Sequence, residues 1–388
     1  MSTIAHVQLR PQLERGRPDF VMIGVVAALT ALGLLMILST SGPLLEAEGL
    51  ARTSQMVRQA IFVGLGTATF IVATAFSDRS WRLLTLWVYG GTLILLILVV
   101  SPVGALRQGA QRWIALGLFD LQPSEVAKPA VILALAALLA PVGGKMKWSR
   151  MLMAFAVVGV PAVLIFLQPD LGTMLVFGFV TVVMLFIAGT NVRQLGLLAV
   201  AAIVVLLIAI ELNVLAEYQV DRLTGFLNPG EQTLSVNYNQ NQSQIAIGSG
   251  GMFGQGLFEG TQTNLSFVPS QTTDFIFTAV AEQLGFVGGS IVIGLFAILV
   301  WRLLMIAAVA RDRFGQLVAV GTAAMISFHV FVNIGMTVGL LPVAGLPLPF
   351  MSFGGSFYIS MMFALGIAHS IWMHRSRIPT GPVPGRTV

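Results

Sequence analysis

Residues 268–302 read VPSQTTDFIFTAVAEQLGFVGGSIVIGLFAILVWR, a polar loop that passes directly into a long apolar segment. Asp274 stands at the junction of the two parts. A carboxylate beside a membrane segment is costly unless a partner or a water-filled cavity offsets its desolvation, so an ionisable group there is a candidate for function. The apolar part is long enough to cross a bilayer. Together the two parts predict a membrane protein with an acidic group at one surface.

The composition supports a membrane protein. Of 388 residues, 56% are hydrophobic and 10% are charged, and the mean hydropathy is +0.89, whereas soluble domains carry roughly 25% charged residues. Apolar runs of spanning length recur from Phe20 almost to the C-terminus, and no cleavable leader is expected. Cysteine is absent, which excludes disulfides, thiolate metal sites and cysteine nucleophiles.

We predict an all-α polytopic membrane protein with about ten transmembrane helices. The expected spans are 20–42, 57–76, 82–101, 123–141, 150–168, 170–189, 193–212, 274–302, 315–341 and 353–373. Residues 20–373 then form one membrane domain, with a large loop, 213–273, between helices seven and eight. Tails of residues 1–19 and 374–388 flank this domain.

The basic residues predict the orientation of the chain. Of 21 Lys and Arg residues, 15 lie in segments expected inside the cell, and Lys128 lies within a predicted helix. The five in the outer segments are Arg52, Arg58, Arg107, Arg112 and Arg222. By the positive-inside rule both termini are cytoplasmic and the 213–273 loop is extracytoplasmic. The net charge of +5 therefore reflects topology, with some attraction to anionic membrane lipids, and we expect no nucleic-acid partner.

The first polar outer segment covers residues 106–129. Arg112 and Trp113 are residue types that anchor a surface stretch at the membrane interface. Pro123 suits the first turn of a helix, and Glu125 and Lys128 then lie three apart on one helical face, where opposite charges can pair. Such a pair either neutralises itself or takes part in catalysis. Its position on the same side as Asp274 favours catalysis.

The second polar outer segment, 213–273, is too long for an ordinary connection and indicates a functional loop. Its one cation, Arg222, suits phosphate recognition, although pairing with Asp221 or Glu217 is an alternative. The glycines of residues 248–256 either allow close backbone approach to a phosphate or form turns, and they do not match a nucleotide-binding loop.

Polar residues continue into the last three helices. Glu282 either hydrogen-bonds a neighbouring helix or lines a cavity. His329 and Asn333, four apart, are expected to be polar contacts between helices and not a metal site. Residues 339–356 contain three prolines and repeated glycines, which predicts a non-helical re-entrant segment whose backbone must be satisfied by protein or by a cavity.

Several of these motifs together identify the chain as resembling a known family. The motifs are Gln122–Glu125, Gln168–Thr173, Ala246–Gly251, Thr273–Phe277 with Ala281–Glu282, and Gly345–Phe350. They resemble the SEDS proteins of bacteria, the family of RodA, FtsW and SpoVE. Gly260–Gln262 and Pro347–Phe350 look more like the RodA branch. The chain departs from the family pattern at Gln271–Thr272, Gln283 and Ser352–Phe357.

The resemblance implies a peptidoglycan glycosyltransferase in the bacterial cytoplasmic membrane. Such an enzyme polymerises lipid II at the outer face, with a class B penicillin-binding protein as its cross-linking partner. The family's loop aspartate corresponds to Asp274, and its acidic and basic pair to Glu125 and Lys128.

A mechanism follows as a hypothesis. Asp274 would accept the proton of the acceptor sugar's 4-hydroxyl, and undecaprenyl pyrophosphate would leave. Arg222, Lys128 or a divalent cation such as Mg or Mn would stabilise the leaving group, with Glu125 orienting Lys128. Substrate contacts are expected from Arg112, Trp113, Arg222, Gln242, Ser243 and Glu282.

Three alternatives are open on the sequence. A flippase or transporter of lipid-linked precursor would also use many helices and intramembrane charges, although polar residues gather on one side and not at the midplane. A scaffold for cell-wall proteins would leave the cost of Asp274 unexplained. An FtsW-like role in division is the alternative to a role in elongation.

Overall fold

The structure is a computed structural model that describes residues 16–107, 110–117, 120–212, 220 and 238–375. Each predicted span coincides with a helix. These helices are α1 (Phe20–Ala47), α2 (Ser54–Ala75), α3 (Asp78–Val100), α4 (Pro123–Leu139), α5 (Trp148–Phe166), α6 (Leu171–Ile187), α7 (Val192–Glu211), α11 (Ile276–Val309), α12 (Arg313–Thr337) and α13 (Gly355–Met373). The all-α polytopic fold is confirmed.

Within the described residues, eight of these helices are long and apolar enough to cross a membrane. The other two are α6, a shorter apolar helix, and α4, which has 17 residues and carries Glu125 and Lys128 near its start. The number of ten crossings therefore stays a prediction.

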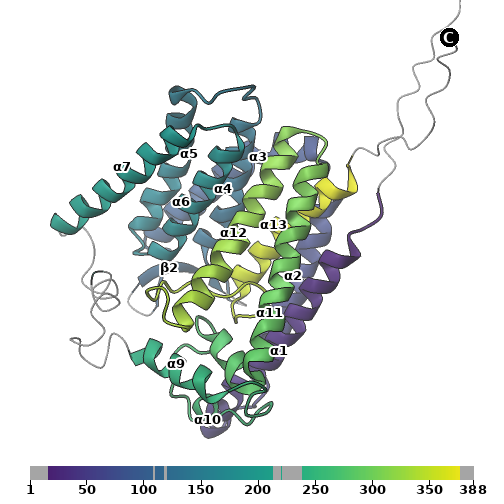
Figure 1. Ribbon diagram of the computed structural model, residues 1–388, viewed down its shortest axis with the longest axis vertical. Helices are drawn as coiled ribbons and strands as arrows, with labels where there is room; N and C mark the ends of the chain where they lie inside the picture. The colour runs from purple at the N-terminus through teal and green to yellow at the C-terminus, as the bar shows by residue number, and fades with distance from the viewer. Residues whose placement is uncertain (1–15, 108–109, 118–119, 213–219, 221–237, 376–388) are drawn as a thin grey trace, which may run out of the picture.

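The helices differ strongly in burial. Figure 1 shows α12 and α13 inside the bundle and α7 projecting at one side. In their apolar spans, 72% of α12 and 78% of α13 is buried, against 6% of α7. The helix α2 packs along α13, α11 packs along α12 and α1, and α4 contacts α3, α12 and α13. The functional candidates on α4 and α12 consequently lie in the best-packed part of the molecule.

A small sheet was not predicted from the sequence. Strands β1 (Ala105–Arg107), β2 (Ala110–Ala115) and β3 (Asp120–Leu121) pair in antiparallel fashion between α3 and α4. The side chain of Gln111 donates from Nε2 to the carbonyl of Ser101 at 2.6 Å, which fixes the sheet over the end of α3. Strands this short leave little hydrophobic alternation to recognise.

The helix α11 is longer than predicted and is broken. It runs to Val309, and Gly285 has non-helical angles (φ 68°, ψ −165°) inside it. Residues 286–309 alone give about 36 Å of helix, enough to cross a hydrocarbon core of about 30 Å. The first part, residues 276–284, therefore extends past the core, beside α9 (Tyr238–Ser249) and α10 (Thr261–Asn264) (Figure 1).

The glycine-rich segment 250–256 fills the break in α11. Amides of residues 255 and 256 donate to carbonyls of residues 282 and 283 at 3.0 and 3.1 Å, and amides of residues 286 and 287 donate to carbonyls of residues 251 and 252 at 2.9 and 3.1 Å. A side chain at Gly250 or Gly254 would collide with the backbone of α11. These glycines thus allow close approach to a helix, and of the two alternatives, approach to a phosphate or turn formation, the first has no support in this arrangement.

At the opposite end of α11, Arg302 lies inside the helix and not in a loop, contrary to the predicted end of this span at residue 302. Its guanidinium pairs with the buried carboxylate of Asp19 at 2.8 Å, and Asp19 also accepts from the amide of Met22 at the start of α1. The ion pair ties α1 to α11.

Candidate functional site

Asp274 lies in the turn that leads into α11, and its side chain is partly exposed. Its amide donates to the carbonyl of Ser270 at 3.0 Å, and its own carbonyl accepts from Nδ2 of Asn333 at 2.7 Å. The carbonyl of Thr273 accepts from the hydroxyl of Ser352 at 2.5 Å. Contacts from α12 and from the segment before α13 therefore hold the backbone on which the carboxylate stands.

The segment between α12 and α13 is non-helical and packed inside the protein, as predicted. Leu346, Leu348 and Phe350 are at most 2% exposed. The carbonyl of Leu346 accepts from Asn333 at 2.8 Å, and the amide of residue 354 donates to Oε1 of Gln59 at 3.1 Å. Side chains on α12 and α2 thus satisfy part of its backbone.

The predicted pair of Glu125 and Lys128 is present at the start of α4. Lys128 Nζ donates to both carboxylate oxygens of Glu125, at 2.9 and 2.8 Å, and the two residues are 2% and 4% exposed. Lys128 Nζ also lies 5.3 Å from the centre of the Phe357 ring, close enough for a cation–π contact. The hydroxyl of Ser360 donates to the backbone carbonyl of Glu125 at 2.6 Å. The pair is buried, and each charged group has the other as its hydrogen-bond partner.

Two residues of α12 connect Asp274 with this pair. Asn333 bonds the backbone of Asp274, while one helical turn away the His329 ring lies 5.1 Å from the ring of Phe357. His329 Nδ1 is 3.2 Å from the carbonyl of Pro347. His329 and Asn333 make polar contacts as predicted, but their partners are backbone carbonyls of the re-entrant segment and of the turn before α11 and not another helix.

Arg112 of β2 binds the turn between α5 and α6. Its Nε donates to the carbonyl of Gln168 at 2.6 Å and its Nη2 to the carbonyl of Pro169 at 2.5 Å. In the same turn Asp170 caps α6 and accepts from the hydroxyl of Ser124, next to Glu125, at 3.2 Å. Asp170 was part of a family motif but was not predicted as a neighbour of the pair, because its contact comes from a residue 46 positions away.

Two predicted substrate contacts are internal in this structure. Glu282 is 0% exposed, and its carboxylate accepts from the amides of Gln262 and Thr263 at 2.7 and 3.0 Å and from the Thr263 hydroxyl at 2.6 Å. Ser243 is also 0% exposed, with its hydroxyl bonded to Thr278 and to the carbonyl of residue 337. Glu282 thus ties residues 262 and 263 to α11, and Ser243 ties α9 to α11 and α12.

The other predicted substrate contacts are either partly exposed or outside the described residues. Gln242 and Trp113 are partly exposed on α9 and β2. Arg222 lies outside the described residues. Among the described residues, no three His, Asp or Glu side chains are grouped as a metal site. The predicted divalent cation therefore stays a prediction, and we derive no step through one.

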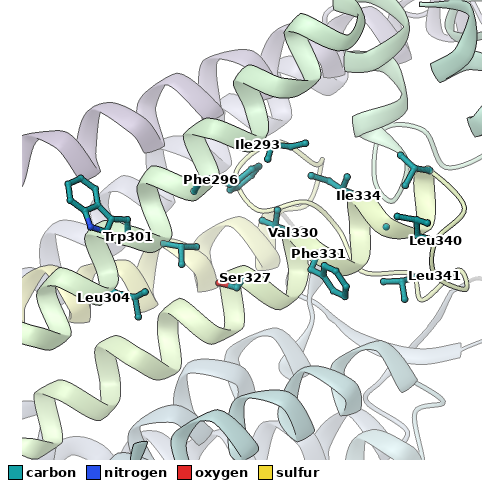
Figure 2. A pocket seen from close by; sticks show the side chains of 14 residues that line it. Ile293, Phe296, Trp301, Leu304, Ser327, Val330, Phe331, Ile334, Leu340 and Leu341 are labelled. Atoms are coloured by element: carbon teal, nitrogen blue, oxygen red, sulfur yellow. The ribbon is translucent and has the colours of Figure 1, made fainter.

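An apolar groove runs between α11 and α12 (Figure 2). Its volume is about 610 Å³, and Phe296, Trp301, Val330, Phe331 and Ile334 line it. Trp301 and Phe331 are 55% and 66% exposed. A hydrophobic chain or an apolar helix would fit this surface.

Fold and site together define a polytopic membrane protein with an acidic loop residue and a buried ion pair linked through one helix. A model described as "Cell cycle protein", for the FtsW, RodA and SpoVE proteins, matches residues 19–377. The chain belongs to this family.

Individual relatives agree with this assignment. The probable peptidoglycan glycosyltransferase FtsW of Geobacter metallireducens is 37% identical over 90% of this chain and 93% of its own length. The peptidoglycan glycosyltransferase MrdB of Escherichia coli K12 is 36% identical over 93% of this chain and 95% of its own. Because these identities are so close, they do not separate the branches of the family.

A solved structure has the same fold. Its title is "Structural coordination of polymerization and crosslinking by a peptidoglycan synthase complex", and it matches with a TM-score of 0.75 and 31% identity over 91% of this chain and 97% of that chain.

Proposed function

We propose that this chain is a peptidoglycan glycosyltransferase that polymerises lipid II, with Asp274 as the general base. The observation that carries the proposal is the placement of Asp274: the residue is partly exposed, Asn333 holds its backbone carbonyl, and Ser352 holds the carbonyl of the preceding Thr273. A general base must lie within hydrogen-bond reach of the proton that it removes, and a fixed backbone keeps it there.

The proposed step moves one proton and exchanges one bond. The carboxylate of Asp274 takes the proton of the acceptor 4-hydroxyl as that oxygen attacks the anomeric carbon of the donor. The bond from this carbon to the pyrophosphate breaks, and undecaprenyl pyrophosphate leaves with the electron pair. Arg222 is the cation that we assign to the departing charge, since fixed cations stabilise such groups, and we propose a positioning role for Lys128 because it is buried. Glu125 holds Lys128 through two hydrogen bonds.

Three residues remain as proposed substrate contacts, namely Gln242, Arg112 and Trp113. Arg112 already donates to two backbone carbonyls, so we assign it to shaping the rim of the site. For Glu282 and Ser243 we propose positioning roles in the outer loop.

Purified full-length chain incubated with lipid II tests the proposal. We expect glycan polymer from wild type and a loss of roughly 10²–10⁴-fold in rate for Asp274→Ala and Asp274→Asn, the range of general-base catalysis. Glu259→Gln, which alters an exposed carboxylate of the same outer loop, is the control and should keep the wild-type rate. Transport of lipid II across vesicles without polymer would support the flippase alternative. Full activity of Asp274→Ala would remove this residue from catalysis.

We also propose a class B penicillin-binding protein as the partner and the groove between α11 and α12 as the place where its transmembrane helix packs. The support is the apolar lining of the groove and the similarity to a chain of a synthase complex. Val330→Trp with Ile334→Trp should fill the groove and abolish co-purification of the partner. Leu207→Trp on the exposed helix α7 is the control. Unchanged co-purification of both variants would exclude this surface.

The setting that we propose is the bacterial cytoplasmic membrane, with both termini in the cytoplasm and the Asp274 end outside. A role in elongation is favoured by the RodA-like residues at 260–262 and 347–350. Restoration of rod shape in cells depleted of their RodA tests this role, and restoration only of septation would assign the chain to division.

A further inference from the structure

Two loops at the end of the bundle opposite to Asp274 are joined to each other. The first leads into α5 and the second into α7. The amide of Met146 donates to the carbonyl of Gly189 at 3.3 Å, and Nε2 of Gln194 donates to the carbonyl of Met146 at 3.3 Å. Oε1 of Gln194 accepts from the amide of Asn191 at 3.1 Å and completes a capping box at the start of α7. The two loops therefore form one fixed surface.

This surface carries cations without carboxylates. Lys145 and Lys147 flank Met146, Arg193 lies in the first turn of α7, and all three side chains are exposed. None of the ion pairs between described residues includes them. The sequence has no Asp or Glu between residues 126 and 169 or between 171 and 210. Asp170 is at the far end of α6, about 26 Å away, and the carboxylates at the starts of α3 and α12, Asp78 and Asp312, are paired with His374 and Arg82.

A cleft of about 530 Å³ opens beside these cations. Trp148, Asn191, Arg193, Gln194 and Leu197 line it together with residue 192. It therefore combines a guanidinium and amide groups with an indole that is 49% exposed. Arginine suits phosphate recognition, and Trp prefers the depth of lipid headgroups.

Apolar surface continues from the cleft along both helices. On α5, Leu152 and Phe155 are 65% and 37% exposed, and on α7, Leu197 and Val200 are 58% and 59% exposed. A ligand that fits this surface has an anionic head and hydrocarbon tails. Basic pockets between transmembrane helices bind lipids of this kind.

We propose that this cleft binds an anionic phospholipid of the bilayer, with its phosphate among Arg193, Lys147 and Lys145 and its acyl chains along α5 and α7. The site is separate from the proposed polymerisation chemistry at Asp274 and does not depend on it. Its role is to fix the exposed helix α7 to the bundle at the membrane surface.

Calorimetric titration of the detergent-solubilised full chain tests the proposal with three probes: dioctanoyl phosphatidylglycerol, dioctanoyl phosphatidylcholine and inorganic phosphate. We expect saturable binding of the phosphatidylglycerol and much weaker binding of the other two. The triple variant K145Q/K147Q/R193Q should raise the Kd for phosphatidylglycerol by roughly tenfold or more, since each cation near the surface attracts anionic lipid.

The matched control is R79Q/R311Q/R313Q, which removes three exposed cations elsewhere on the predicted cytoplasmic face and should leave the Kd unchanged. An equal rise in the Kd for phosphatidylglycerol in both triple variants would mean that binding is general electrostatic attraction. Equal affinity for phosphatidylglycerol and phosphatidylcholine would mean hydrophobic adsorption. Either result would overturn the proposal. Phosphate binding as tight as that of the lipid would make this a site for free anions and would also overturn it.

A second measurement does not depend on the charge variants. Because the chain has no cysteine, a single Leu197→Cys can carry a fluorophore at the cleft, and Leu207→Cys carries it about 15 Å further along α7. Phosphatidylglycerol with a nitroxide on its headgroup should quench the fluorophore at residue 197 several times more than at residue 207. Equal quenching at both positions would contradict a lipid head bound in the cleft.

Discussion

The pair of Glu125 and Lys128 and the loop acid Asp274 are built in opposite ways. The pair lies on consecutive turns of one helix, is almost fully buried, and satisfies itself through two hydrogen bonds. Asp274 lies in a turn, is partly exposed, and stands on a backbone that residues 59 and more positions away hold in place. The first arrangement depends on local spacing, and the second depends on assembly of the whole bundle.

Breaking the pair should have the largest effect on stability. Lys128→Met leaves the Glu125 carboxylate buried and unpaired, which costs about 3–5 kcal/mol. The double variant Glu125→Gln with Lys128→Met should recover much of this loss, because no buried charge remains. Thermal unfolding in detergent measures both. A double variant no more stable than Lys128→Met would contradict the idea of a self-contained pair.

Removing the break in α11 should have the second-largest effect on stability. Gly285→Ala places a Cβ against the backbone of Gly254 and Met252 at an angle that only glycine adopts readily, at a cost of about 1–3 kcal/mol for the angle and more for the collision. Gly294→Ala in the same helix meets open space and should be neutral or slightly stabilising. Similar melting temperatures for the two variants would show that the break is not required.

Removing the support of Asp274 should affect activity more than stability. Asn333→Ala deletes hydrogen bonds to the carbonyls of Asp274 and Leu346, for about 1–3 kcal/mol of stability. Displacement of the base should lower the rate of lipid II polymerisation by about 10²-fold. Thr322→Ala, whose hydroxyl bonds only its own helix at Val318, is the control. A normal rate for Asn333→Ala would mean that Asp274 is held by other contacts.

The smallest effect is expected at Phe357. Phe357→Leu keeps an apolar side chain and removes the ring beside Lys128, a loss of roughly 1 kcal/mol. Phe353→Leu removes a ring that packs against Phe62 and controls for aromatic packing alone. If the Phe357 effect persists unchanged in the Lys128→Met background, the cation–π contact does not contribute.

Features that depend on neighbouring residues were predictable from the sequence, and contacts between residues far apart in the chain were not. Hydropathy located the helices, and a spacing of three gave the ion pair, because both depend on neighbours within one turn. The hydrogen-bond partners of Glu282, Gln262 and Thr263, were not predicted because they lie across a loop. Gly285 lies in an apolar run, and no feature of the neighbouring sequence predicts a break in the helix. The break forms because residues 250–256, distant in the chain, bond the backbone on both sides of it.

The break in α11 at Gly285 bears on how the protein enters the membrane. Residues 276–284 carry Glu282 and backbone groups whose partners are supplied by residues 250–256 and 262–263. In hydrocarbon each such unsatisfied group would be costly. Residues 286–309, by contrast, are complete as a helix and can cross unaided. We therefore expect the insertion machinery to release the shorter piece on the side of the membrane where its loop lies, so that transfer of residues 250–284 as one unit is a condition for forming the site.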